Sequence, residues 1–162
     1  MLTGLAPVWR PDARLLIVGS FPGVASLAAH QYYAHPRNAF WPLMAALTGQ
    51  PDLPQQPYEA RLQALLNARV ALWDAVATCE RQGSLDAAIR LAQPADLPAL
   101  VRQLPALEAV ACNGAEALRQ TRRLLPAWPL VALPSSSPAH AGLGFGAKRE
   151  AWCTALRPFC PG

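Results

Sequence analysis

The sequence lacks any arrangement of cysteines that is typical of metal ligands. Four are present, Cys79, Cys112, Cys153 and Cys160, and no two of them form a C-x-x-C pair or a closely spaced set with histidine. Structural zinc sites and iron–sulfur clusters depend on such spacings. We therefore expect four reduced thiols in or near the core and no metal site.

Long hydrophobic runs are also lacking. No apolar run approaches a length of about 18 residues, which would indicate a transmembrane helix. The first residues, MLTGLAPVWRPDARLL, lack the basic segment and the long apolar segment of a signal peptide. These absences predict a cytoplasmic protein with no membrane partner.

Charged residues are scarce, at 15% of the chain, and lysine occurs once, at position 148. The apolar content of 52% argues against disorder. A chain of 162 residues is long enough for one domain, spanning 1–162, with a sizeable core. The net charge of +4 is compatible with an anionic partner such as nucleic acid but is too small to require one.

Short apolar runs alternate with segments of helical spacing along the chain. The predicted strands are 14–19, 70–73, 108–112 and 129–133, and the predicted helices are 38–47, 58–67, 115–125 and 147–156. Irregular structure is expected over 1–13 and 20–37. The stretch 75–104 contains a Gly83-Ser84 break, and weak helical pieces are expected after it. This alternation predicts an α/β fold with a mainly parallel sheet and helices on both faces.

Polar or turn residues follow each predicted strand. They are the segment 19–23, Asp74, the pair Asn113 and Gly114, and the segment 135–140. In an open parallel sheet, ligands bind beyond the carboxyl ends of the strands. The four segments are therefore expected to meet at one edge and form one composite site.

The stretch after the first strand, residues 32–41, reads YYAHPRNAFW and is unusual for a plain core segment. Its aromatic side chains can stack on a planar ring. Asn38 can hydrogen-bond the edge of a base or hold a water molecule, and Arg37 can meet a phosphate. The sequence thus places the side chains needed to bind a nucleotide at the expected position of the site.

Three stretches of the chain resemble the uracil-DNA glycosylase superfamily, and within it the hypoxanthine-DNA (deoxyinosine) glycosylase branch. They are GSFPG followed by YYAHPRNAFW, then ALWDAVATCERQGSLD, and finally LPSSSPAHA followed by a K-x-x-x-W helix from Lys148 to Trp152. The resemblance implies a three-layer α/β/α sandwich with a central four-stranded parallel sheet. It also implies hydrolysis of the N-glycosidic bond of a deaminated base in DNA, leaving an abasic site, by a monomer that uses no cofactor.

The resemblance assigns two central roles. Tyr33 falls where relatives place an aromatic ring under the flipped base, and Asn38 falls on the asparagine of the H-P-x-N motif that is important in the deoxyinosine branch. Asn38 is therefore the catalytic candidate, orienting water and hydrogen-bonding the base. The alternative for Asn38 is a helix N-cap made by the same side chain.

The remaining candidates surround these two. The turn of Gly19, Ser20 and Phe21 should wall the base pocket, with Asn113 as a further base contact. The residues expected to contact DNA are Arg37, Ser135, Ser136, Ser137, His140, Lys148 and Arg149. The loop 143–145 is a candidate apolar wedge into the duplex. Asp74 and Asp86 either activate water or satisfy N–H groups at the ends of secondary-structure elements.

Other functions remain open at this point. Mismatch-specific relatives place an asparagine where this chain has Phe21, which argues against a uracil or mismatch glycosylase of the same fold. A second alternative is an inactive nucleic-acid-binding module. A small-molecule nucleotide enzyme is disfavoured, because neither a P-loop nor a G-x-G-x-x-G motif follows the first strand.

Overall fold

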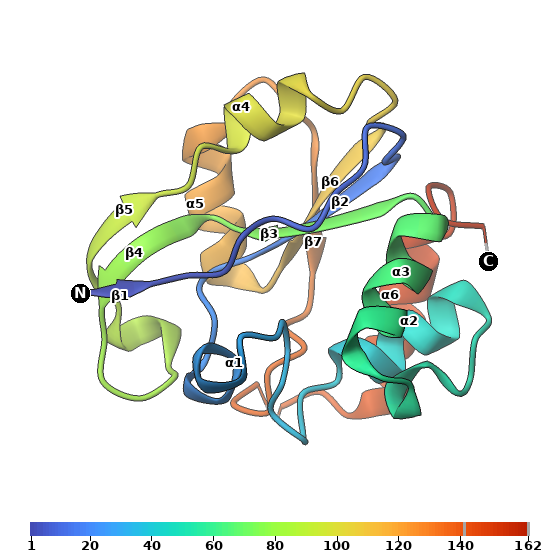
Figure 1. Ribbon diagram of the computed structural model, residues 1–162, viewed down its shortest axis with the longest axis horizontal. Helices are drawn as coiled ribbons and strands as arrows, with labels where there is room; N and C mark the ends of the chain where they lie inside the picture. Colours follow the sequence, from blue (N-terminus) through green and yellow to red (C-terminus); the bar gives the residue numbers. More distant parts are fainter. Residues whose placement is uncertain (141, 162) are drawn as a thin grey trace.

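The computed structural model describes residues 1–140 and 142–161; Gly162 and Ala141, the last residue of the LPSSSPAHA stretch, lie outside the described residues. A parallel sheet of four strands runs through the molecule (Figure 1). Its strands are β2 (Leu15–Gly19), β3 (Val70–Asp74), β6 (Ala109–Asn113) and β7 (Leu130–Leu133), in the order β3-β2-β6-β7. Every neighbouring pair is parallel, so all four carboxyl ends lie at the same edge.

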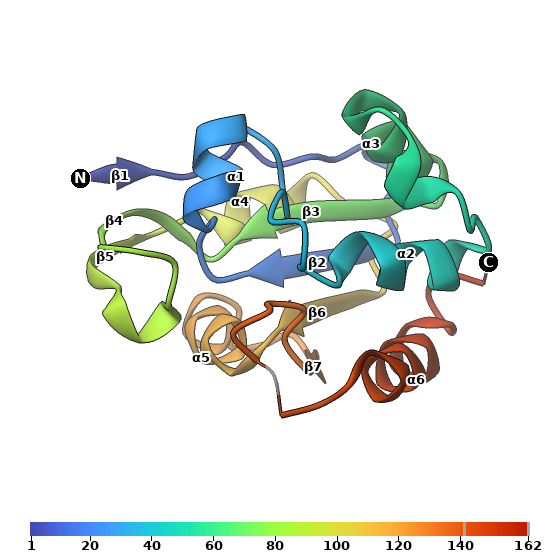
Figure 2. The same ribbon diagram turned by 90° about the horizontal axis from the view of Figure 1, so that it is seen from below.

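Helices cover both faces of this sheet (Figures 1 and 2). One face carries α2 (Phe40–Thr48), α3 (Tyr58–Asn67) and α6 (Phe145–Leu156), and the other carries α4 (Leu97–Arg102) and α5 (Ala115–Leu124). The predicted three-layer arrangement with a central four-stranded parallel sheet is confirmed.

The central strand β2 shows why the sheet needs helices on both sides. All five of its residues are buried. Because successive strand side chains point to opposite faces, Leu15 and Ile17 pack into the core with Phe40, whereas Leu16 and Val18 pack into the core with Leu97. A strand buried on both faces reads as a continuous apolar run, which is the pattern of residues 15–18.

A second, antiparallel sheet lies beside the first and was not predicted. It contains β1 (Leu2–Thr3), β4 (Val76–Glu80) and β5 (Arg90–Pro94), in the order β1-β4-β5. The helical pieces expected after the Gly83-Ser84 break are present as the single-turn helix Asp86–Ala88 and as α4, but the expectation is wrong over β5. The strand β4 is stabilised by pairing on both sides, while β5 is exposed at every residue and has no apolar periodicity that sequence analysis could detect.

Two further local differences concern loops. The segment 20–37 contains a short helix, α1 (Val24–Ala29), where irregular structure was expected. The last helix begins at Phe145 rather than at 147, so part of the glycine-rich loop is helical. The segment Leu53–Gln55 forms the single-turn helix η1, and Asp86–Ala88 forms η2 between β4 and β5.

Within the described residues, no helix has the length and apolar character needed to cross a membrane.

Candidate functional site

A cavity of about 780 Å³ opens at the carboxyl edge of the parallel sheet. All four predicted strand-end segments contribute to its lining, together with residues before α2 and the tip of the β4–β5 hairpin. The expectation that these four segments meet at one edge is confirmed. The predicted site residues that line it are Gly19, Ser20, Phe21, Tyr33, Arg37, Asn38, Asn113, Ser135, Ser136, Ser137 and His140.

Asn38 lies on the wall of this cavity, two residues before α2 begins. The helix starts at Phe40 and its N-cap position is Ala39, so the predicted cap is displaced by one residue. The Oδ1 atom of Asn38 nevertheless accepts a hydrogen bond of 2.9 Å from the Phe40 N–H. An amide oxygen has a second lone pair and the amide nitrogen has two donors. The hydrogen bond to the helix start therefore orients the Asn38 side chain and leaves polar groups available for a ligand.

Tyr33 has a left-handed backbone conformation, with φ of 56°, which is uncommon outside glycine. Its ring stacks on the fully buried ring of Phe40, with 3.9 Å between ring centroids and 21° between ring planes. The neighbouring Ala34 N–H donates to Ser26 Oγ at 3.1 Å, which helps to hold the turn. Tyr33 is thus a supported aromatic wall of the cavity, and its stacking on a base stays a prediction.

Asn113 and Ser136 are joined by two hydrogen bonds. The Asn113 Nδ2 donates to Ser136 Oγ, and the Ser136 N–H donates to Asn113 Oδ1, both at 2.9 Å. The Ser136 carbonyl accepts from the Ala39 N–H, also at 2.9 Å. Ser136 is only 1% exposed. Its hydroxyl holds the turn after β7 against β6, and its carbonyl holds the same turn against the start of α2. This geometry does not present Ser136 Oγ to a phosphate in solvent.

The basic candidates are one internal side chain and three exposed ones. Lys148 is 5% exposed and its Nζ donates to the His140 carbonyl at 3.0 Å, while burial lowers the pKa of its ammonium group. It therefore supports the loop of Ser137 to His140 from inside. Arg37, His140 and Arg149 are exposed, and the first two line the cavity at its rim.

Asp74, at the end of β3, is the most unusual polar group of the cavity. It is 5% exposed, and its Oδ2 is buried with no hydrogen-bond partner in the described part of the chain. Burial, and secondly the nearby charge of Asp86, raise the pKa of Asp74 to about 7. A side chain on Gly19 would bring its Cβ within 2.4 Å of Asp74 Oδ1, so the close packing here requires glycine.

The tip of the β4–β5 hairpin forms the wall that sequence analysis missed. Ser20 Oγ donates to Asp86 Oδ1 at 2.6 Å, and the Val24 N–H donates to Ser84 Oγ at 2.9 Å. Arg81 donates to the Pro22 carbonyl at 2.6 Å. These bonds attach the hairpin tip to the turn after β2. Two features of the sequence pointed to this tip, the Gly83-Ser84 break and the candidate Asp86.

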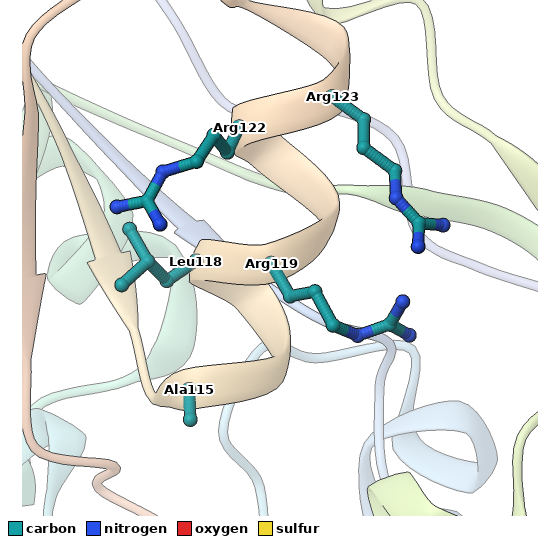
Figure 3. A pocket seen from close by; sticks show the side chains of 5 residues that line it. All are labelled: Ala115, Leu118, Arg119, Arg122 and Arg123. Atoms are coloured by element: carbon teal, nitrogen blue, oxygen red, sulfur yellow. The ribbon is translucent and has the colours of Figure 1, made fainter.

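A second, smaller hollow of about 320 Å³ lies along α5 (Figure 3). It is lined by Ala115, Leu118, Arg119, Arg122 and Arg123. Arg119 is paired with Glu116 on the same helix. This hollow contains none of the predicted residues. In the described residues, no group of three His, Cys, Asp or Glu side chains is placed to hold a metal ion.

Comparison with known families assigns the chain to one superfamily. A family model described as "Uracil DNA glycosylase superfamily" matches residues 6–156. The chain belongs to the uracil DNA glycosylase superfamily. Its cavity at the carboxyl edge of the sheet is therefore the candidate active site of a superfamily member.

Individual relatives agree with this assignment. A Methanosarcina barkeri protein named hypoxanthine DNA glycosylase is 37% identical over 111 residues, which cover 68% of this chain and 70% of the relative. A protein of the same name from Methanosarcina acetivorans is 33% identical over 138 residues, covering 85% of this chain and 87% of the relative. A solution NMR structure of a Methanosarcina acetivorans protein provisionally named a uracil DNA glycosylase superposes with a TM-score of 0.85, at 30% identity and 97% coverage of both chains.

The Asn113–Ser136 pair predicts an unequal effect of two neighbouring serine substitutions. Ser136→Ala leaves the buried Asn113 Nδ2 without its acceptor, so we expect a loss of about 1–3 kcal/mol in the free energy of unfolding. The control is Ser137→Ala, because Ser137 is less buried and its Oγ accepts only from the Ala139 N–H. Urea unfolding measures both, and equal losses would contradict the structural role of Ser136.

The raised pKa of Asp74 predicts a pH-dependent stability. In the folded protein Asp74 keeps its proton up to about pH 7, whereas in the unfolded chain it loses the proton at about pH 4. The free energy of unfolding of wild type therefore falls as the pH rises between these two values. Asp74→Asn cannot ionise. Relative to wild type, we expect its free energy of unfolding to rise by on the order of 4 kcal/mol across this window. The exposed variant Asp52→Asn should show no such rise; a flat Asp74→Asn difference would contradict the burial argument.

Proposed function

We propose that this protein is a DNA glycosylase that hydrolyses the N-glycosidic bond of hypoxanthine in deoxyinosine-containing DNA and leaves an abasic site. The observation that carries the proposal is the single cavity in which Tyr33, Asn38 and the polar strand ends face the same space. Its volume of about 780 Å³ is within the range of small-molecule sites and suits a base taken out of the DNA stack. The names of the two Methanosarcina relatives support hypoxanthine as the base.

The reaction needs a base held in place and a water molecule aimed at the sugar. As the bond between C1′ and N9 breaks, its electron pair stays with the purine and the sugar becomes positive. Water then forms the new bond to C1′. We assign to Asn38 the orientation of this water and to Tyr33 the stacking contact. The fixed position of each side chain, through Phe40 in both cases, supports these roles.

The DNA backbone is proposed to run along the exposed rim of the cavity. Two exposed basic residues lie at this rim, Arg37 and His140, and a third, Arg149, is exposed on the adjoining helix α6. The cavity lining also contains the partly buried residues Ser135 and Ser137. At the start of α6, Leu143 and Phe145 are 36% and 45% exposed, as an apolar wedge into the duplex requires. We propose that the chain acts on DNA as a monomer.

The proposal is tested first at Asn38. Wild type should release hypoxanthine from a labelled duplex, detected by strand cleavage at the abasic product. Asn38→Ala should lower the single-turnover rate by about 10²–10³, the cost typical of losing one positioned amide. Asn67→Ala, an exposed asparagine on α3, is the matched control and should retain the wild-type rate. Preferential release of uracil would instead identify a uracil glycosylase, and unaltered release by Asn38→Ala would remove its catalytic role.

A second test separates the ring of Tyr33 from its hydroxyl group. Tyr33→Leu removes the aromatic surface, so we expect a loss of about 1–3 kcal/mol in affinity for the damaged duplex, or about tenfold or more in the rate at limiting enzyme. Tyr33→Phe keeps the ring and its contact with Phe40 and should retain most of the affinity. Gel-shift titration with a deoxyinosine duplex measures both, and equal losses would exclude stacking as the main contribution of Tyr33.

A further inference from the structure

The inner wall of the cavity carries two buried polar atoms that the protein itself leaves without a partner. They are Asp74 Oδ2 and the hydroxyl of Tyr33, among the few side-chain atoms of this kind in the described residues. Both side chains lie beside Gly19, since a Cβ built there would be 2.4 Å from Asp74 Oδ1 and 3.1 Å from the Tyr33 hydroxyl. Buried polar groups are nearly always hydrogen-bonded. Two such atoms at one point of a cavity indicate that a ligand supplies their partner.

Among the residues that the structure describes, no positive charge compensates a carboxylate at position 74. The group whose charge acts on it is the Asp86 carboxyl, which faces it from η2, and the phenols of Tyr32 and Tyr33 approach from the segment before α2. The other ionisable side chains lining the cavity are His35, Arg37, Glu116 and His140. Burial and the like charge of Asp86 both disfavour a carboxylate at position 74. The geometry therefore favours a carboxylic acid, which can donate a hydrogen bond.

A donor is what the leaving base requires. Negative charge grows on the purine as the glycosidic bond breaks, and a carboxylate against it would repel this charge. A neutral carboxyl group at the same point stabilises it through its O–H. We propose that Asp74 contacts the leaving base as a neutral carboxylic acid and donates a hydrogen bond to a purine oxygen or nitrogen that gains charge in the transition state. This inference rests on the proposed glycosylase function.

The proton balance of the step closes without another reactant. The electron pair of the bond from C1′ to N9 stays with the purine, and water forms the new bond to C1′. The proton that water loses neutralises the released base, directly or by replacing a proton that Asp74 has passed to the base. Asp74 ends each turnover protonated, as it began.

This role is distinguishable from water activation by its pH dependence. A carboxylate that takes a proton from water works when ionised, so the rate would rise with pH and an amide could not replace it. A carboxylic acid donor works when protonated, so the rate falls as the pH rises through the pKa of Asp74, about 7. Asparagine has nearly the same shape and keeps a donor at every pH.

The experiment measures hypoxanthine release from a deoxyinosine duplex in single turnover, with enzyme above its dissociation constant at each pH. For wild type we expect the rate to fall about tenfold between about pH 6 and about pH 8. Asp74→Asn should keep activity within about tenfold of wild type and lose this falling limb. Asp74→Leu, with no donor, should lose activity by about 10² or more while still binding undamaged duplex.

Controls separate Asp74 from the other titrating groups. Asp52→Asn, an exposed residue outside the cavity, should retain the wild-type profile. His35 and His140 are present in both wild type and Asp74→Asn. The difference between the pH–rate profiles of these two proteins therefore reports on Asp74. Thermal melting verifies that each variant is folded.

Two kinds of result would overturn the inference. A wild-type rate that rises or stays flat with pH, or a folded but inactive Asp74→Asn, would overturn the donor role alone and leave the glycosylase function intact. No hypoxanthine release by wild type at any pH would overturn the proposed function and this inference with it.

Discussion

The two hydrogen bonds between Asn113 and Ser136, together with one from Ala39, fix the relative positions of three segments that line the cavity. Asn113 ends β6, Ser136 follows β7, and the Ser136 carbonyl holds the N–H of Ala39 at the start of α2. Because Asn38 precedes Ala39, the position of its amide depends on a contact made across the sheet edge. A polar pair buried at this point fixes geometry more strictly than an apolar contact, since both partners must be satisfied at once.

Two sets of side chains preorganise the cavity: buried polar groups hold its loops in place, and other side chains line it. Ser136 and Lys148 are buried and hydrogen-bonded to the loops that they shape, while Asn38 and Tyr33 are each fixed through Phe40 and still line the cavity. Side chains held in this way lose little freedom when a ligand arrives. Asp74 differs from them because no group in the described part of the chain hydrogen-bonds its Oδ2.

The sequence was most informative where burial imposes a pattern. The strands β2, β3, β6 and β7 and the helices behind them were predicted because their apolar periodicities are strong, and the polar strand ends then had to meet at one edge. The β4–β5 hairpin was missed because β5 is exposed and carries no such pattern. Types of residue at the site could also be predicted, but not which serine faces inward or that Lys148 is buried, because these depend on contacts between segments far apart in the chain.

The burial of Lys148 has a consequence for the product of the proposed reaction. Some enzymes attack a sugar carbonyl with a lysine amine, forming a Schiff base that leads on to elimination of the neighbouring phosphate. Lys148 is the only lysine of this chain, it does not belong to the cavity lining, and its Nζ donates to the His140 carbonyl. The chain has no lysine placed for this attack. The abasic strand would therefore leave with its phosphodiester backbone intact, and a separate nuclease or lyase would have to cut it.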